Sequence, residues 1–180
     1  RIVRNAKQLF PRWATGVSIK GNIELLNADY DLLISNGEQE ETNPHEEDNN
    51  ASKAVTARVR IQPVDDLLFG FSLYRDDNTT EKVTAEDKTT STAAPKALTT
   101  IGMQVSYNRE SFGVIAEYVN GSYVQKGNND KNQIGYFLQL AYKGNELLTP
   151  FYRYEFVDLN TNIDKDSGTI SILGLNVPVE

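Results

Sequence analysis

The feature that most constrains the fold of this chain is a repeated alternation of apolar and polar residues with a period of two. Nine segments show it, and each is about as long as a strand that crosses a membrane. A period of two places every second side chain on the same face of a β-strand. The sequence therefore predicts nine strands, at residues 14–25, 29–36, 54–62, 67–75, 98–107, 111–120, 132–143, 147–157 and 168–177.

The breaks between these segments alternate between short and long. The short breaks contain Asn, Asp, Pro or Gly, which favour tight turns, and the long breaks are polar. In an up-and-down sheet this order puts the short turns on one rim and the long loops on the other, as in outer-membrane barrels with extracellular loops. The predicted turns are 26–28, 63–66, 108–110 and 144–146, and the predicted extracellular loops are 37–53, 76–97, 121–131 and 158–167.

Composition excludes several other classes. No run approaches the roughly 20 apolar residues of a transmembrane helix, whereas a barrel strand needs only about 9–11 residues. The net charge of -7 argues against a nucleic-acid partner, which would require a basic surface. A single His and no Cys remove disulfides and thiolate metal sites. The absence of an initiator Met and of a secretory signal predicts that the chain is a segment of a longer protein.

Alternation alone does not separate a membrane barrel from a soluble β-sandwich, since both have one apolar face per sheet. The aromatic residues on that face favour the barrel. One group lies beside the short turns and the other toward the long loops, as the two membrane interfaces favour. The turn-side group is Tyr30, Tyr107, Phe112 and Tyr142, and the loop-side group is Trp13, Tyr118, Tyr136, Tyr154 and Phe156.

Some residues depart from this pattern. Tyr74, Phe137 and Phe151 fall on the polar face, and Pro150 interrupts a predicted strand. The segment 168–177 has no clear phase. The alternation gives no reason for any of these departures.

Three short motifs resemble the phosphate-selective porin O/P group and related porins. They are FPRWATGV at 10–17, the strand end from Tyr30 to Gly37, and TPFYRYE at 149–155 followed by Gly174-Leu175-Asn176. The resemblance implies a trimeric barrel of sixteen or eighteen strands with a loop folded into the pore, about half of it outside this chain. Outer-membrane lipid and lipopolysaccharide would surround it. The Lys- and Arg-rich constriction of the phosphate-selective members is not visible here, so phosphate selectivity is not implied.

Charged residues on the polar face are the candidate site. Fixed charges in a pore set the ionic preference for the passing solute. The alternative is that they are ordinary solvated residues or cross-strand pairs that stiffen the wall. Arg58 and Arg60 stand out, because two like charges on one strand face require nearby acids or a functional reason. The predicted pore-lining residues are Lys20, Glu24, Arg58, Arg60, Glu117, Lys143, Arg153 and Glu155.

Metal binding and catalysis receive little support. The acidic run between Glu38 and Asp48 surrounds His45, and carboxylates are the ligands that hard cations prefer. Its irregular spacing favours a solvated loop, so no metal site is predicted. His45 lies in this loop and not on a strand beside a serine and a carboxylate, so no catalytic group is predicted.

We therefore predict an all-β, antiparallel up-and-down transmembrane β-barrel, of which this chain supplies about nine strands. The expected function is a water-filled channel for small hydrophilic solutes or ions, with no enzymatic step, cofactor or nucleic acid. One alternative is a soluble or surface β-sandwich that binds a partner through its long loops. Another is an outer-membrane enzyme or adhesin that uses the barrel as an anchor.

Overall fold

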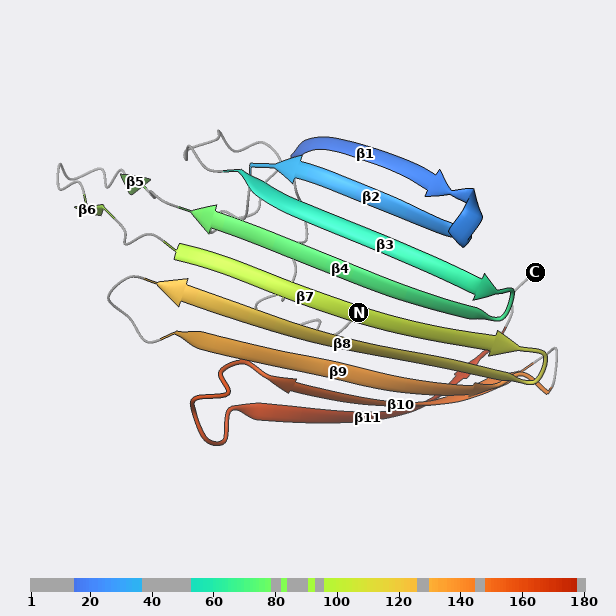
Figure 1. Ribbon diagram of the computed structural model, residues 1–180. Helices are drawn as coiled ribbons and strands as arrows, with labels where there is room; N and C mark the ends of the chain where they lie inside the picture. Colours follow the sequence, from blue (N-terminus) through green and yellow to red (C-terminus); the bar gives the residue numbers. More distant parts are fainter. Residues whose placement is uncertain are drawn as a thin grey trace.

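The chain forms one antiparallel sheet of nine strands in which sequence neighbours pair (Figure 1). The computed structural model describes residues 15–36, 53–78, 82–83, 91–92, 96–125, 130–144 and 148–177. The prediction of an all-β, up-and-down antiparallel sheet is confirmed. Its strands are β1 (Gly16–Ile23), β2 (Ala28–Ser35), β3 (Ala54–Val64), β4 (Leu67–Asn78), β7 (Lys96–Arg109), β8 (Phe112–Gln125), β9 (Lys131–Tyr142), β10 (Thr149–Asp158) and β11 (Ser167–Asn176).

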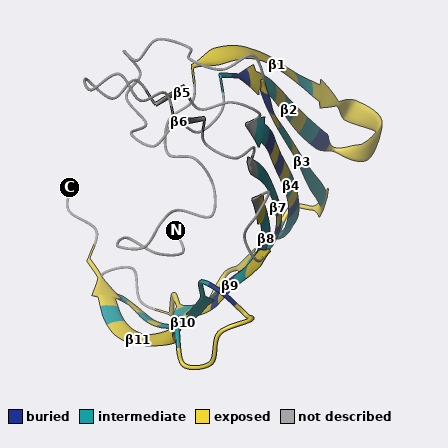
Figure 2. Cartoon of the chain, turned by 90° about the vertical axis from the view of Figure 1, so that its left-hand side faces the viewer, coloured by how far each residue is buried: buried dark blue, intermediate teal, exposed yellow. Residues whose placement is uncertain are grey.

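The sheet curves across its width, so it has a convex face and a concave face (Figure 2). β1 and β11 are the two edge strands and do not pair with each other, which leaves the sheet open. Within the described ranges, extensive contacts between elements of this sheet join hydrogen-bonded neighbours. The exception is the contact of β3 with the turn before β2. The nine strands of this sheet therefore form a single curved layer.

The first turn differs from the prediction. β1 ends at Ile23, and Glu24–Leu26 form a 3-10 helix, η1, so Glu24 and Leu25 are not strand residues. Asn27 closes the turn in the left-handed region with φ 44°, and its backbone N–H donates to the Glu24 carbonyl at 3.0 Å. Asn tolerates this region better than most residues because its short side chain bonds locally.

No helix among the described residues has the length and apolar content needed to cross a membrane.

Two of the long connections, those after β4 and after β8, are shorter than the alternation predicts. β4 and β8 run on to Asn78 and Gln125, and a small pair, β5 (Lys82–Val83) with β6 (Ser91–Thr92), lies inside the predicted loop 76–97. Residues 126–130 alone separate β8 from β9, while 143–148 separate β9 from β10 on the turn rim. The connections on the loop rim are therefore much longer than those on the turn rim for the first hairpins, but the two connections of β9 are about equally long. The predicted loop 37–53 lies almost wholly outside the described residues.

The hydrogen-bond register staggers the strands. One row of directly paired residues begins at Tyr30, near the turn end of β2, and finishes at Phe156, near the loop end of β10. A row perpendicular to the strands thus crosses from one rim to the other. Strands that are tilted and staggered in this way are the geometric requirement for closing a sheet into a barrel. The row is Tyr30, Val59, Phe71, Met103, Tyr118, Tyr136 and Phe156.

Candidate functional site

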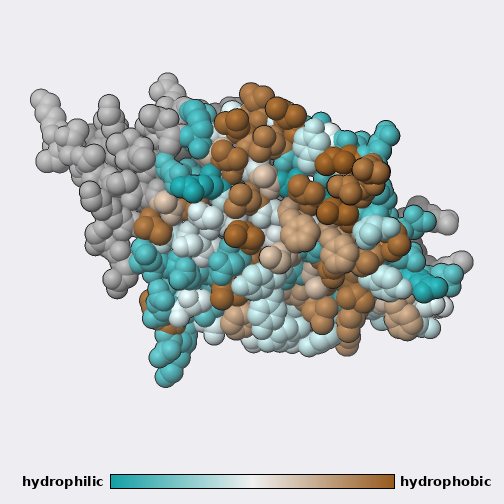
Figure 3. All heavy atoms as spheres, in the orientation of Figure 1, coloured by the Kyte–Doolittle hydropathy of each residue, from teal (hydrophilic) through white to brown (hydrophobic). Residues whose placement is uncertain are grey.

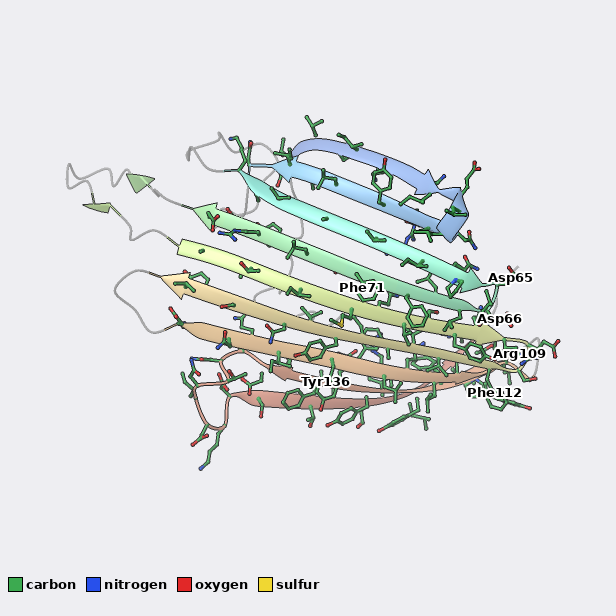
Figure 4. All side chains as sticks on the ribbon, viewed as in Figure 1. Asp65, Asp66, Phe71, Arg109, Phe112 and Tyr136 are labelled. Carbon is green, nitrogen blue, oxygen red and sulfur yellow. The ribbon has the colours of Figure 1, made fainter. Side chains whose placement is uncertain are left out.

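The register assigns each side chain to one of two faces, because directly paired residues in an antiparallel sheet point to the same side. The outer, convex face is largely apolar: Figure 3 shows apolar residues gathered over the strands, and Figure 4 labels Phe71, Phe112 and Tyr136 among the side chains. Many of these side chains are exposed, and Met103 and Leu138 are 50% and 42% exposed. Other exposed members are Val17, Ile19, Leu32, Ile34, Leu73, Ile101 and Leu140.

The aromatic residues predicted for the membrane interfaces also lie on the outer face, apart from Trp13, which is outside the described residues. Several contact one another across strands. The Phe112 and Tyr142 ring centroids are 5.2 Å apart at the turn rim, and those of Tyr136 and Phe156 are 5.0 Å apart toward the loops. One group lies near the turn rim and the other nearer the loop rim, which agrees with the predicted grouping. Their contact with a membrane stays a prediction.

The inner face carries a set of charges that we call the charged belt. Six members were among the predicted pore-lining residues. Asp29 and Asp31 were missed, although their alternation with the apolar residues Tyr30 and Leu32 would have placed them on the polar face. The belt lies in three adjacent rows of paired residues and consists of Lys20, Asp29, Asp31, Arg58, Arg60, Glu117, Arg153 and Glu155.

Ion pairs between β1, β2 and β3 account for half of the belt. Lys20 Nζ lies 3.1 Å from Asp31 Oδ2. Arg60 Nε donates to both carboxylate oxygens of Asp29, at 2.9 and 2.8 Å. Arg58 is paired with Asp31 in the ladder, as Arg60 is with Asp29. The acids on β2 thus explain how β3 tolerates two arginines on one face.

Three further members of the belt lie on β8 and β10. Arg153 forms an ion pair with Glu155, and its guanidinium lies 3.8 Å from the ring centroid of Phe137. The Arg153 and Glu155 side chains are only 16% and 12% exposed. Glu117 interacts electrostatically with Arg153 and Arg58. Phe137 therefore has a reason to lie on the polar face, because an aromatic ring attracts a cation placed over it.

The other inner aromatic residues also have partners. The Tyr74 hydroxyl donates to Asp76 Oδ2 at 3.0 Å, and both side chains are buried. Phe151 covers Gly174 on β11, where an added Cβ would lie 2.3 Å from the ring. A ring laid over a cross-strand glycine fills the surface that the glycine leaves empty. These contacts explain why the aromatic side chains of Tyr74 and Phe151 lie on the otherwise polar face.

Two predicted pore-lining residues lie outside the three rows. Glu24 is in η1, in the turn after β1. Lys143 follows the end of β9, lies over Gly113 and donates to Asn108 Oδ1. Both belong to the turn rim and not to the belt.

The belt contains four basic and four acidic residues. Opposite charges at contact distance largely cancel each other's field at longer range, and salt screens what remains. The belt can therefore offer hydrogen bonds and local charge to a small solute while keeping little net potential.

No metal centre is formed by the described residues: none of their His, Cys, Asp and Glu side chains cluster in threes or more in a way that could hold an ion. His45 and the acidic run around it are outside the described residues. In the loop between β10 and β11, desolvation and the neighbouring Asp158 carboxylate raise the pKa of Asp166. That pair of carboxyls alone is too small a ligand set for a cation.

Comparison of this chain with protein-family models, with curated proteins and with solved structures finds no significant match. The resemblance to porins therefore stays a prediction from the sequence. What the site offers chemically follows from its own side chains, which provide hydrogen-bond donors, acceptors and paired charges on a concave wall.

Proposed function

We propose that this chain is part of a transmembrane β-barrel of the Gram-negative outer membrane, and that its inner face lines a water-filled channel. Small hydrophilic solutes or ions would cross by passive diffusion, with no chemical step. The observation that carries the proposal is the contrast between the two faces. Broad apolar surface is exposed on the convex side, and the paired charges lie on the concave side.

Lipid accounts for the outer face better than water does. Soluble monomers rarely expose apolar patches of more than a few hundred Å², whereas barrels in the outer membrane present an apolar band about 25 Å tall. In a soluble sandwich a second sheet would cover this face. No strand among the described residues stacks on it.

The direction of the edge strands is consistent with a larger barrel. In an antiparallel sheet of nine strands, the first and last run in the same direction, so β1 and β11 are parallel. They are unable to pair antiparallel with each other. Closure by antiparallel pairing therefore needs an odd number of further strands, which gives the even total usual for such barrels.

Conductance in a planar lipid bilayer tests the proposal. Full-length protein that contains this chain, added from detergent to one side, is expected to raise the current in discrete steps, with a size that follows the conductivity of the bulk salt solution. Protein unfolded in urea before addition is the control and should give no steps. A full-length protein that remains monodisperse without detergent and gives no steps would be a soluble protein, as the sandwich alternative requires.

A further inference from the structure

A polar cavity of about 340 Å³ lies where the charged belt meets the turn rim. This volume is within the range of roughly 300–1,000 Å³ that small-molecule sites occupy. The cavity combines inner-face residues with residues of the first turn. Its lining is Asn22, Ile23, Glu24, Asn27, Ala28, Asp29, Arg60, Gln62 and Leu68.

Arg60 is held in place with donors to spare. Its Nε donates to both oxygens of Asp29, and its aliphatic stem lies over Gly70, where an added Cβ would be 4.0 Å from Arg60 Cγ. Within the described residues, Nη1 and Nη2 make no hydrogen bond. A guanidinium fixed through one nitrogen offers the other two at a set geometry.

The amide side chains of the cavity supply acceptors in the same way. Asn27 Nδ2 donates to the Gln62 carbonyl at 2.7 Å, and Gln62 Nε2 donates to the Asp65 carbonyl at 2.8 Å. The two amides are thus oriented by backbone carbonyls, that of Asn27 by a carbonyl of β3 and that of Gln62 by a carbonyl of the turn after β3. Their side-chain oxygens, and the whole amide of Asn22, make no hydrogen bond within the described part of the chain.

The charges of the cavity disfavour an ionic ligand. An anion bound to Arg60 would lie beside the Asp29 carboxylate, with Glu24 nearby, and a cation would face the guanidinium. A hydroxyl group both donates and accepts, so neighbouring hydroxyls can use the free Nη donors and the amide oxygens together. Leu68, which has the inner-face phase, provides apolar surface for the C–H groups between them.

We infer that this cavity is a binding subsite for a neutral polyhydroxylated solute, such as a single sugar ring. The inference deepens the proposed function and rests on it, since the solute would reach the cavity through the water-filled lumen. Arg60 and Asn22 then act as binding residues, and Asp29 as the residue that positions Arg60.

Saturation-transfer NMR with D-glucose and the detergent-solubilised full-length protein tests the inference without requiring conduction. Glucose should receive saturation from the protein, and glycine and acetate should not. Arg60→Gln and Arg60→Lys should each weaken glucose binding roughly 10-fold or more, since a charge-assisted bond is lost or its fork geometry is removed. Asn22→Ala should weaken it less. Arg75→Gln is the matched control, because Arg75 forms the same kind of pair, with Asp77, on the outer face.

The outcomes separate this inference from the proposed function. Normal bilayer conductance with no saturation of glucose would overturn the subsite and leave the pore. Binding of acetate or glycine in place of glucose would also overturn it, since the site would then select charge. Glucose binding that Arg60→Gln abolishes and Arg75→Gln preserves would uphold the subsite even if no conductance were found.

Discussion

Met103→Arg is expected to destabilise the folded protein in a bilayer by about 2–4 kcal/mol, the cost of an arginine that faces lipid near the midplane of a barrel. Met103 is on the outer face, 50% exposed, in the middle of β7. In the membrane its side chain would have no water to solvate a charge. The measurement is a urea titration of folding in phospholipid vesicles, with folded and unfolded protein separated by gel mobility.

Gln104→Arg is the matched control, because Gln104 is the next residue and belongs to the inner face. Its partner in the ladder is Glu117, and its side chain lies over Gly70. An arginine there would remain hydrated and would face an acid, so the expected loss is well under that of Met103→Arg. Equal losses at both positions, or a larger loss at Gln104, would show that the two faces have been assigned to the wrong environments.

Reversing charge in the belt is expected to change ion selectivity. Arg58→Glu combined with Arg60→Glu leaves two basic and six acidic residues in the belt. The reversal potential under a tenfold salt gradient should move toward cation selectivity, by a measurable part of the about 59 mV that an ideally selective pore would give. The shift should shrink as salt rises, since the Debye length falls from about 8 Å at 0.15 M to about 3 Å at 1 M.

The opposite substitution provides the control. Asp29→Lys combined with Asp31→Lys leaves six basic and two acidic residues, and the reversal potential should move toward anion selectivity. We leave Arg153 unchanged, because its contacts with Phe137 and Glu155 are largely buried and their loss would disturb folding. Unchanged potentials in both double variants at low salt would remove the belt from the conducting path.

Much of the fold was predictable because period-2 alternation is a local property of the chain. Each strand shows it without reference to its partners, so the nine strands and their order agree with the structure. The ends of strands were less predictable. β1 stops at Ile23 because Asn27 adopts a left-handed conformation, and β8 runs past Gly121 because its neighbours continue to pair there.

The contacts of the candidate site depend on register, which the sequence alone does not supply. Arg58 and Arg60 seemed to repel each other until the pairing of β2 with β3 placed Asp31 and Asp29 opposite them. Phe137 seemed out of place until the pairing of β9 with β10 brought Arg153 over its ring. Cross-strand partners from distant parts of the chain supplied the missing physical reasons.

Thiol accessibility along β7 tests the central claim most directly, since the chain contains no native Cys. Single cysteines would replace Met103, Gln104, Val105 and Ser106, and isolated membranes would be treated with a charged, water-soluble thiol reagent. We expect rapid labelling at the inner positions 104 and 106, and labelling at the outer positions 103 and 105 only after detergent is added. Equal labelling at all four positions in intact membranes would contradict the account, because lipid would then not cover the outer face.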